Sequence, residues 1–137
     1  TKRRPSSKIQ ADIEFGWKMA KEMGRLDIGQ SVIIRDRTVL AVEAVEGTDA
    51  CIARTAGICP RGGFTLVKVA KPQQDMRFDL PTIGPRTIEI MRKAGGRAIA
   101  IEAHKTILID RQKTLADAHA ANIVIVSIED ADRRSAQ

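Results

Sequence analysis

The acidic segment Asp75-Met-Arg-Phe-Asp79 is the part of the sequence best suited to chemistry. Two carboxylates four residues apart can hold a divalent cation or activate a water molecule, and Arg77 between them can bind a phosphate oxygen. A charged surface loop has the same composition. The prolines around the segment and its apolar residue Phe78 instead favour a stiff, anchored loop that holds a site. The segment alone leaves both interpretations open.

Carboxylates also gather between a predicted strand and a predicted helix, at Glu43, Glu46 and Asp49. A hard cation such as Mg²⁺ takes oxygen ligands, often one or two carboxylates completed by substrate phosphates. The alternative is structural, with Thr48 or Asp49 capping the helix and Glu46 in solvent. On these residues alone we favour the structural alternative.

Cationic side chains stand on both sides of the acidic segment. Lys68 ends a predicted strand, where it could neutralise a pyrophosphate or simply face solvent. Gly84-Pro-Arg86-Thr87 precedes a predicted helix, and backbone amides at a helix start attract phosphate together with an arginine. Proline also occupies helix starts for structural reasons. His104, in a predicted turn, is a minor candidate for acid–base chemistry.

The elements that must position these residues alternate along the chain. Four helices are predicted from a period near 3.6, over residues 9–23, 48–56, 87–94 and 112–121. Strands are predicted from β-branched runs, over residues 31–34, 38–45, 64–69, 98–101, 106–109 and 123–127. Only residues 70–86 show neither period. The expected fold class is α/β (α+β mixed), a mixed sheet of about six strands with helices packed on it.

Composition limits the function further. Hydrophobic residues make up 43% and aromatic residues 3%, so we expect one domain with an aliphatic core. The net charge is +6, and it falls to +2 without the four basic residues of positions 1–8. A nearly balanced body with few aromatic rings argues against a nucleic-acid partner. Residues 1–8 are expected to be a basic linker, and residues 129–137 a polar tail.

The two cysteines and the hydropathy indicate the compartment. Two cysteines are too few for a disulfide framework, and Cys51 is expected to be a small buried apolar residue. A reducing, cytoplasmic compartment fits this usage. No apolar run reaches the roughly 20 residues that cross a bilayer, and the first residues lack the hydrophobic stretch expected of a signal peptide.

Several phrases of the sequence resemble the carboxy-terminal domain of the LpxI family, the UDP-2,3-diacylglucosamine pyrophosphatases. The phrases are Asp12-Ile-Glu-Phe-Gly-Trp17, Ala41-Val-Glu-Ala-Val-Glu-Gly-Thr-Asp-Ala50, the run from Val67 to Thr87, and Ala100-Ile-Glu-Ala-His-Lys-Thr-Ile-Leu-Ile-Asp110. The likeness covers residues 9–127, and the central phrase contains the acidic segment.

The resemblance implies hydrolysis of the pyrophosphate of UDP-2,3-diacylglucosamine to UMP and 2,3-diacylglucosamine 1-phosphate (lipid X) in lipid A biosynthesis. It implies Mg²⁺ as cofactor and a place at the cytoplasmic face of the inner membrane of Gram-negative bacteria, with peripheral membrane contact. An essential aspartate of the family best matches Asp75 and Asp79, expected as catalytic residues and metal ligands. Glu46 and Asp49 are expected as further ligands.

The resemblance also assigns substrate binding and a missing partner. Substrate contacts are expected from Lys68, Arg77, Thr82, Arg86 and Thr87. The resemblance implies an additional amino-terminal domain, which is expected to lie outside this chain, and a substrate bound between the two domains. Residues 9–128 are therefore expected to be the catalytic domain, weakly active or inactive alone. The alternative is a binding or regulatory domain that holds a phosphorylated sugar nucleotide or lipid without cleaving it.

Overall fold

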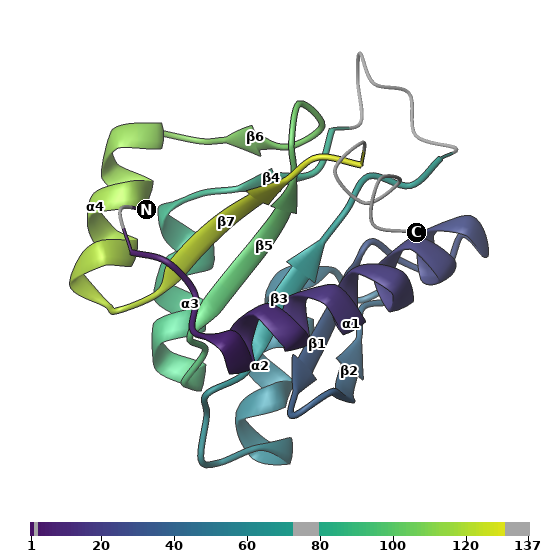
Figure 1. Ribbon diagram of the computed structural model, residues 1–137, viewed down its shortest axis with the longest axis horizontal. Helices are drawn as coiled ribbons and strands as arrows, with labels where there is room; N and C mark the ends of the chain where they lie inside the picture. Colours follow the sequence, from purple (N-terminus) through teal and green to yellow (C-terminus); the bar gives the residue numbers. More distant parts are fainter. Residues whose placement is uncertain (2, 73–79, 131–137) are drawn as a thin grey trace.

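A five-stranded sheet forms the centre of the computed structural model, which describes residues 1, 3–72 and 80–130 (Figure 1). Its strands lie in the order β2-β1-β3-β5-β7. Their bounds are Ser31–Arg35 for β1, Thr38–Val42 for β2, Thr65–Lys68 for β3, Ala98–Glu102 for β5 and Val124–Ile128 for β7. β3, β5 and β7 are parallel, whereas β1 is antiparallel to both β2 and β3. The predicted mixed sheet is confirmed.

A short second sheet lies where the sequence showed no period. β4 (Thr82–Ile83) pairs in parallel with β6 (Ile107–Leu108). Irregular backbone was predicted throughout residues 70–86, and β4 is a correction to that prediction. A strand of two residues is too short to show alternation, so its pairing partner defines it.

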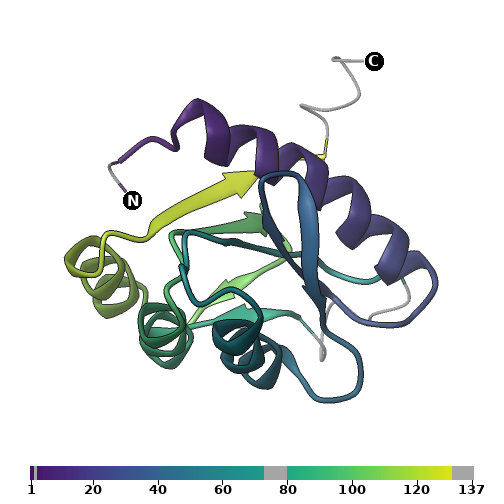
Figure 2. The same cartoon turned by 90° about the horizontal axis from the view of Figure 1, so that it is seen from below.

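Helices cover both faces of the sheet (Figure 2). Their bounds are Ser7–Arg25 for α1, Thr48–Ile58 for α2, Pro85–Ala94 for α3 and Arg111–Ala120 for α4. α1 packs alone on one face against β1 and β3, and the other three lie on the opposite face. The crossovers through α3 and α4 move across the sheet in the same direction and share one hand, so their helices share a face. None of the described helices is long and apolar enough to cross a membrane.

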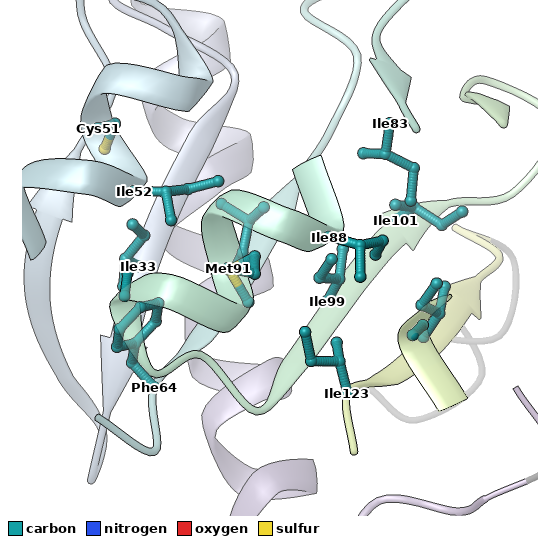
Figure 3. Packing of buried hydrophobic residues seen from close by; sticks show 14 of the residues in the cluster. Ile33, Cys51, Ile52, Phe64, Ile83, Ile88, Met91, Ile99, Ile101 and Ile123 are labelled. Carbon is teal, nitrogen blue, oxygen red and sulfur yellow. The ribbon is translucent and has the colours of Figure 1, made fainter. Parts of the chain in front are cut away.

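The core is aliphatic, as the scarcity of aromatic residues predicted. Under α1, the fully buried Ile13 packs with Val32 and Val67. On the other face, Phe64 and Met91 lie among isoleucines of the strands and of α3 (Figure 3). β5 is buried on both faces, which explains its continuous apolar run.

Three helices begin before their predicted starts, and the cap of α2 also differs from the prediction. α3 begins at Pro85 instead of Thr87, and α4 at Arg111 instead of Gln112. α1 begins at Ser7 rather than Ile9, because the Ser6 hydroxyl accepts a hydrogen bond from the Ile9 amide at 3.2 Å. The prediction that Thr48 or Asp49 caps α2 is wrong, since the N-cap is Gly47 and no side chain caps that helix. Thr48 therefore has its hydroxyl available for another contact.

Candidate functional site

Charged and hydroxyl side chains gather at one end of the sheet, which we call the carboxyl edge because Lys68, Glu102 and Ile128 end β3, β5 and β7 there. Antiparallel pairing of β1 places its first residue, Ser31, opposite Lys68 at the same edge. α2 follows β2, which ends at the same edge, and α3 and α4 follow β4 and β6 of the short second sheet. In open α/β sheets this edge is where ligands bind.

Lys68 is buried at this edge, with 6% of its surface exposed. Its Nζ donates to the Thr82 carbonyl oxygen at 2.7 Å, which ties the end of β3 to β4. Burial lowers the pKa of Lys68, and the nearby carboxylates of Glu43 and Asp49 act in the opposite direction. An ammonium group has three donors, so this cation keeps hydrogen-bonding capacity beyond its contact with Thr82.

Glu43 leaves β2 at the carboxyl edge and is also buried, at 7% exposed. Its Oε2 accepts from the Thr48 hydroxyl at 2.8 Å, and Thr48 Oγ1 lies 3.2 Å from the Ser31 hydroxyl. A side chain at Gly29 would place its Cβ 1.8 Å from the Glu43 carbonyl oxygen, so only glycine allows the chain to pass there. Ser31 and Thr48 were absent from the predicted site residues.

The starts of α2 and α3 are joined by an ion pair. Arg86 Nε lies 3.2 Å from Asp49 Oδ2, and the arginine side chain is 84% exposed. The Thr87 hydroxyl accepts from the Gly84 amide at 3.1 Å, so it completes the first turn of α3. A substrate contact by Thr82, Arg86 or Thr87 stays a prediction, although all three lie at the carboxyl edge.

Glu46 is engaged away from Lys68. Its carboxylate accepts from Arg54 Nη2 at 2.7 Å and from the Ala44 amide at 3.0 Å. The Arg54 hydrogen bond holds the pKa of Glu46 below its usual value. Within residues 1, 3–72 and 80–130, no group of three or more His, Cys, Asp or Glu side chains is placed to hold a metal. The predicted site residues Asp75, Arg77 and Asp79 lie outside the described residues.

Glu102 forms a second buried charged group at the same edge. It is 1% exposed, and it accepts from Lys21 Nζ at 2.6 Å and from the Ala70 amide at 3.0 Å. Lys105 Nζ is 3.3 Å away. The sequence signal for this group is an acidic residue that ends an otherwise apolar strand. His104 in the following turn is exposed and lies 3.2 Å from Glu129.

The fold and this edge define the class of protein: an α/β domain with a candidate site for an anionic ligand at the carboxyl ends of its parallel strands. The family model of the LpxI C-terminal domain matches residues 1–126. The chain therefore belongs to the LpxI family, as its sequence phrases indicated.

A curated relative supports the same assignment. The chain is 38% identical over 136 residues to the UDP-2,3-diacylglucosamine pyrophosphatase LpxI of Caulobacter vibrioides (strain ATCC 19089 / CIP 103742 / CB 15). The match covers 94% of this chain and 49% of the relative. The chain thus spans about half the length of the curated relative it matches.

Proposed function

We propose that this chain is the catalytic domain of an enzyme that hydrolyses the pyrophosphate bond of UDP-2,3-diacylglucosamine, releasing UMP and lipid X for lipid A biosynthesis. The named activity of the relative supports the substrate. The observation in the structure that carries the proposal is Lys68, a buried ammonium at the carboxyl edge, beside the start of α3 and its Arg86. Because the relative is longer, we propose the activity for the complete protein, whose amino-terminal domain helps to enclose the substrate.

The charge of the substrate explains why these residues suit it. Pyrophosphate oxygens carry negative charge that increases at the leaving group as the bond breaks, and fixed cations stabilise that change. Lys68 and Arg86 supply such cations, and amides in the first turn of α3, which begins at Pro85, can attract the same anion. Arg77 is proposed to add another cation, and Thr82 and Thr87 to help position the substrate.

We further propose that Mg²⁺ takes part. Magnesium is often held by one or two carboxylates together with substrate phosphates, and the carboxylates of Glu43 and Asp49 near Lys68 fit that pattern. Asp75 and Asp79 are proposed as further ligands or as the group that activates water. Glu46 would join them only by giving up its contact with Arg54. The ion would polarise the phosphoryl oxygens and lower the pKa of the attacking water.

The proposed substrate also implies a location. A diacylated sugar nucleotide partitions toward bilayers, whereas its uridine diphosphate group is soluble. We therefore propose that the protein works in the cytoplasm, in peripheral contact with the inner membrane of a Gram-negative bacterium.

The test is UMP release from UDP-2,3-diacylglucosamine by the complete protein, with Mg²⁺ or with EDTA. Asp75→Ala and Asp79→Ala are compared with Asp117→Ala, whose carboxylate pairs with Lys113 on α4. We expect EDTA to abolish release and at least one of the first two variants to lose about a hundred-fold or more, with Asp117→Ala unaffected. Substrate binding without UMP release by the wild type would favour a binding domain and refute the enzyme.

A further inference from the structure

Glu102 carries a buried negative charge that the proposed chemistry does not use. It is the last residue of β5, and the four residues before it in that strand are apolar. Taking a carboxylate out of water costs free energy that its partners return only in part, so an apolar side chain would serve stability as well. A charge kept at this position fits a need for a specific geometry at the carboxyl edge.

The Glu102 carboxylate holds the part of the chain that leaves β3. Pairing of β3 with β5 ends at Lys68, and Glu102 lies one residue beyond the paired residues of β5. Its Oε2 accepts from the Ala70 amide at 3.0 Å. From the β1 side, the Gln30 carbonyl oxygen accepts from the Val69 amide at 2.8 Å. The two residues that follow Lys68 are therefore held from both sides of β3.

Two lysines fix the orientation of this carboxylate. Lys21 Nζ, from α1, donates to Glu102 Oε1 at 2.6 Å, and Lys105 Nζ lies 3.3 Å from the same oxygen. Lys21 Nζ also lies 5.0 Å from the centroid of the Trp17 ring. One carboxylate oxygen is thus held by positive charge, which directs the other toward the Ala70 amide.

The held residues lead into the acidic segment, which lies outside the described residues. The next side chain, Lys71, places its Nζ 2.9 Å from Asp27 Oδ1, just after the end of α1. Beyond the acidic segment, the returning chain is held by Lys68, which donates to the Thr82 carbonyl oxygen at 2.7 Å. Buried charges on two neighbouring strands, Glu102 on β5 and Lys68 on β3, therefore hold the chain before and after the acidic segment.

We propose that Glu102 is a positioning residue for the proposed hydrolysis, acting through Ala70 rather than by touching the substrate. It fixes the path of the chain out of β3, and with it the placement of Lys68 and of the start of the acidic segment. The inference rests on the proposed function, and it adds a role for a buried acid on β5. Such support matters because a displacement of about 1 Å in a reacting group can lower a rate about a hundred-fold.

The first experiment is Glu102→Gln in the complete protein, assayed by UMP release from UDP-2,3-diacylglucosamine. Glutamine keeps the size of the side chain but removes the charge that the two lysines hold in place. We expect kcat to fall about ten-fold or more and the Mg²⁺ concentration that gives half the maximal rate to rise. KM should change less than about three-fold, because the displaced groups act mainly in the transition state.

The matched control is Asp12→Asn, the same change in another buried acid that accepts from two backbone amides, at the opposite end of the sheet. Its kcat and Mg²⁺ dependence should equal those of the wild type, at a temperature where circular dichroism shows both variants folded. An unchanged kcat in Glu102→Gln, or an equal loss in the two variants, would overturn the proposal. A wild type that releases no UMP would instead refute the proposed function, on which the inference rests.

A second measurement needs no change to a buried side chain. Amide hydrogen exchange of the complete protein, followed by NMR, should be at least about ten-fold slower at Ala70 than in an unstructured peptide. In Lys21→Gln, which alters a side chain that is 27% exposed, Ala70 should exchange faster while Leu66 inside β3 keeps its protection. An unprotected Ala70 amide in the wild type, or equal protection of Ala70 in Lys21→Gln, would also overturn the proposal.

Discussion

At the scale of single residues, the buried Lys68 makes folding depend on pH. Burial lowers its pKa below 10.5, so between the lowered pKa and 10.5 the unfolded chain binds more protons than the folded chain. Stability attributable to Lys68 therefore increases as pH rises through that window. Lys68→Met removes the ionisable group, so any other effect of this substitution on the free energy of unfolding does not depend on pH in this window.

The prediction is that the free energy of unfolding of the wild type, minus that of Lys68→Met, rises with pH by up to about 1.4 kcal/mol per unit. Urea unfolding of both chains at a series of alkaline pH values measures this difference. A flat difference, or one that falls as pH rises, would show that Lys68 does not titrate at a lowered pKa.

Cys51 gives a second prediction at this scale. The thiol is fully buried, and burial raises its pKa from 9.0 to about 11. The thiolate is the reactive form, so its fraction near neutral pH is about a hundred-fold lower than in the unfolded chain. The test uses a Cys59→Ser variant, so that Cys51 is the cysteine labelled. Iodoacetamide should label Cys51 at least about a hundred-fold more slowly in the folded chain than in the urea-unfolded chain, as measured by mass spectrometry. Similar rates in the two states would contradict the burial of the thiol.

At the scale of elements, α1 supports the hairpin of β1 and β2 through Asp12. Asp36 and Arg37 both have positive φ, at 51° and 53°, in the left-handed region that residues other than glycine, asparagine and aspartate, such as Arg37, rarely adopt. The Asp12 carboxylate, 3% exposed, accepts from their two amides at 3.1 and 2.8 Å. These hydrogen bonds hold the turn in its unfavourable conformation.

Asp12→Ala is therefore expected to lower the free energy of unfolding by about 2–3 kcal/mol, since it removes two bonds to a charged acceptor. Asp12→Asn, which keeps an oxygen acceptor, should lose less. Arg37→Gly should gain about 1 kcal/mol by relieving the backbone. Denaturant unfolding of the three variants measures these free energies. If Asp12→Ala leaves the free energy of unfolding unchanged, the turn needs no support from α1.

Two helical glycines predict opposite effects of the same change. A Cβ at Gly16 of α1 would lie 2.7 Å from Val67 Cγ2 and 2.8 Å from Ile34 Cγ1, so Gly16→Ala should destabilise the protein by about 1–3 kcal/mol. At Gly57 of α2 no atom lies within 4 Å, and Gly57→Ala should stabilise it by about 0.5–1 kcal/mol. Thermal unfolding distinguishes the two. Equal effects would mean that α1 does not pack closely on the sheet.

The elements differ in how far their sequence could predict them. The stripe through Ile13, Trp17 and Ala20 predicted α1 because a helix that packs on one face needs that period. The apolar run of β5 predicted a strand because a strand that is buried on both faces needs apolar residues at successive positions. β4 and the Gly47 cap could not be predicted, since a short strand and a glycine cap depend on contacts distant in sequence.

At the scale of the whole molecule, topology brings the candidate site together. The placement of Lys68, Asp49 and Arg86 at the carboxyl edge could be predicted because each stands at the end of a strand or the start of a helix; their role in binding stays a prediction. The placement of Ser31 beside Lys68 could not be predicted, because it follows from the antiparallel pairing of β1 and β3. Glu102 likewise meets the Ala70 amide only because β3 and β5 are neighbours. Local sequence patterns contain no such pairing information.

The two ends of the sheet therefore predict different effects of removing one positive charge. Arg86 is exposed at the carboxyl edge, whereas Arg97 is exposed just before β5, at the opposite end. If phosphate binds at the carboxyl edge, Arg86→Gln should lower kcat/KM for UDP-2,3-diacylglucosamine by about ten- to a hundred-fold, the loss of one charge-assisted hydrogen bond. Arg97→Gln makes the same change in net charge and should leave kcat/KM nearly unchanged, as measured by UMP release. If Arg86 acted only through the overall positive charge of the protein, both variants would lose kcat/KM equally. An equal loss in the two variants would therefore contradict phosphate binding at the carboxyl edge.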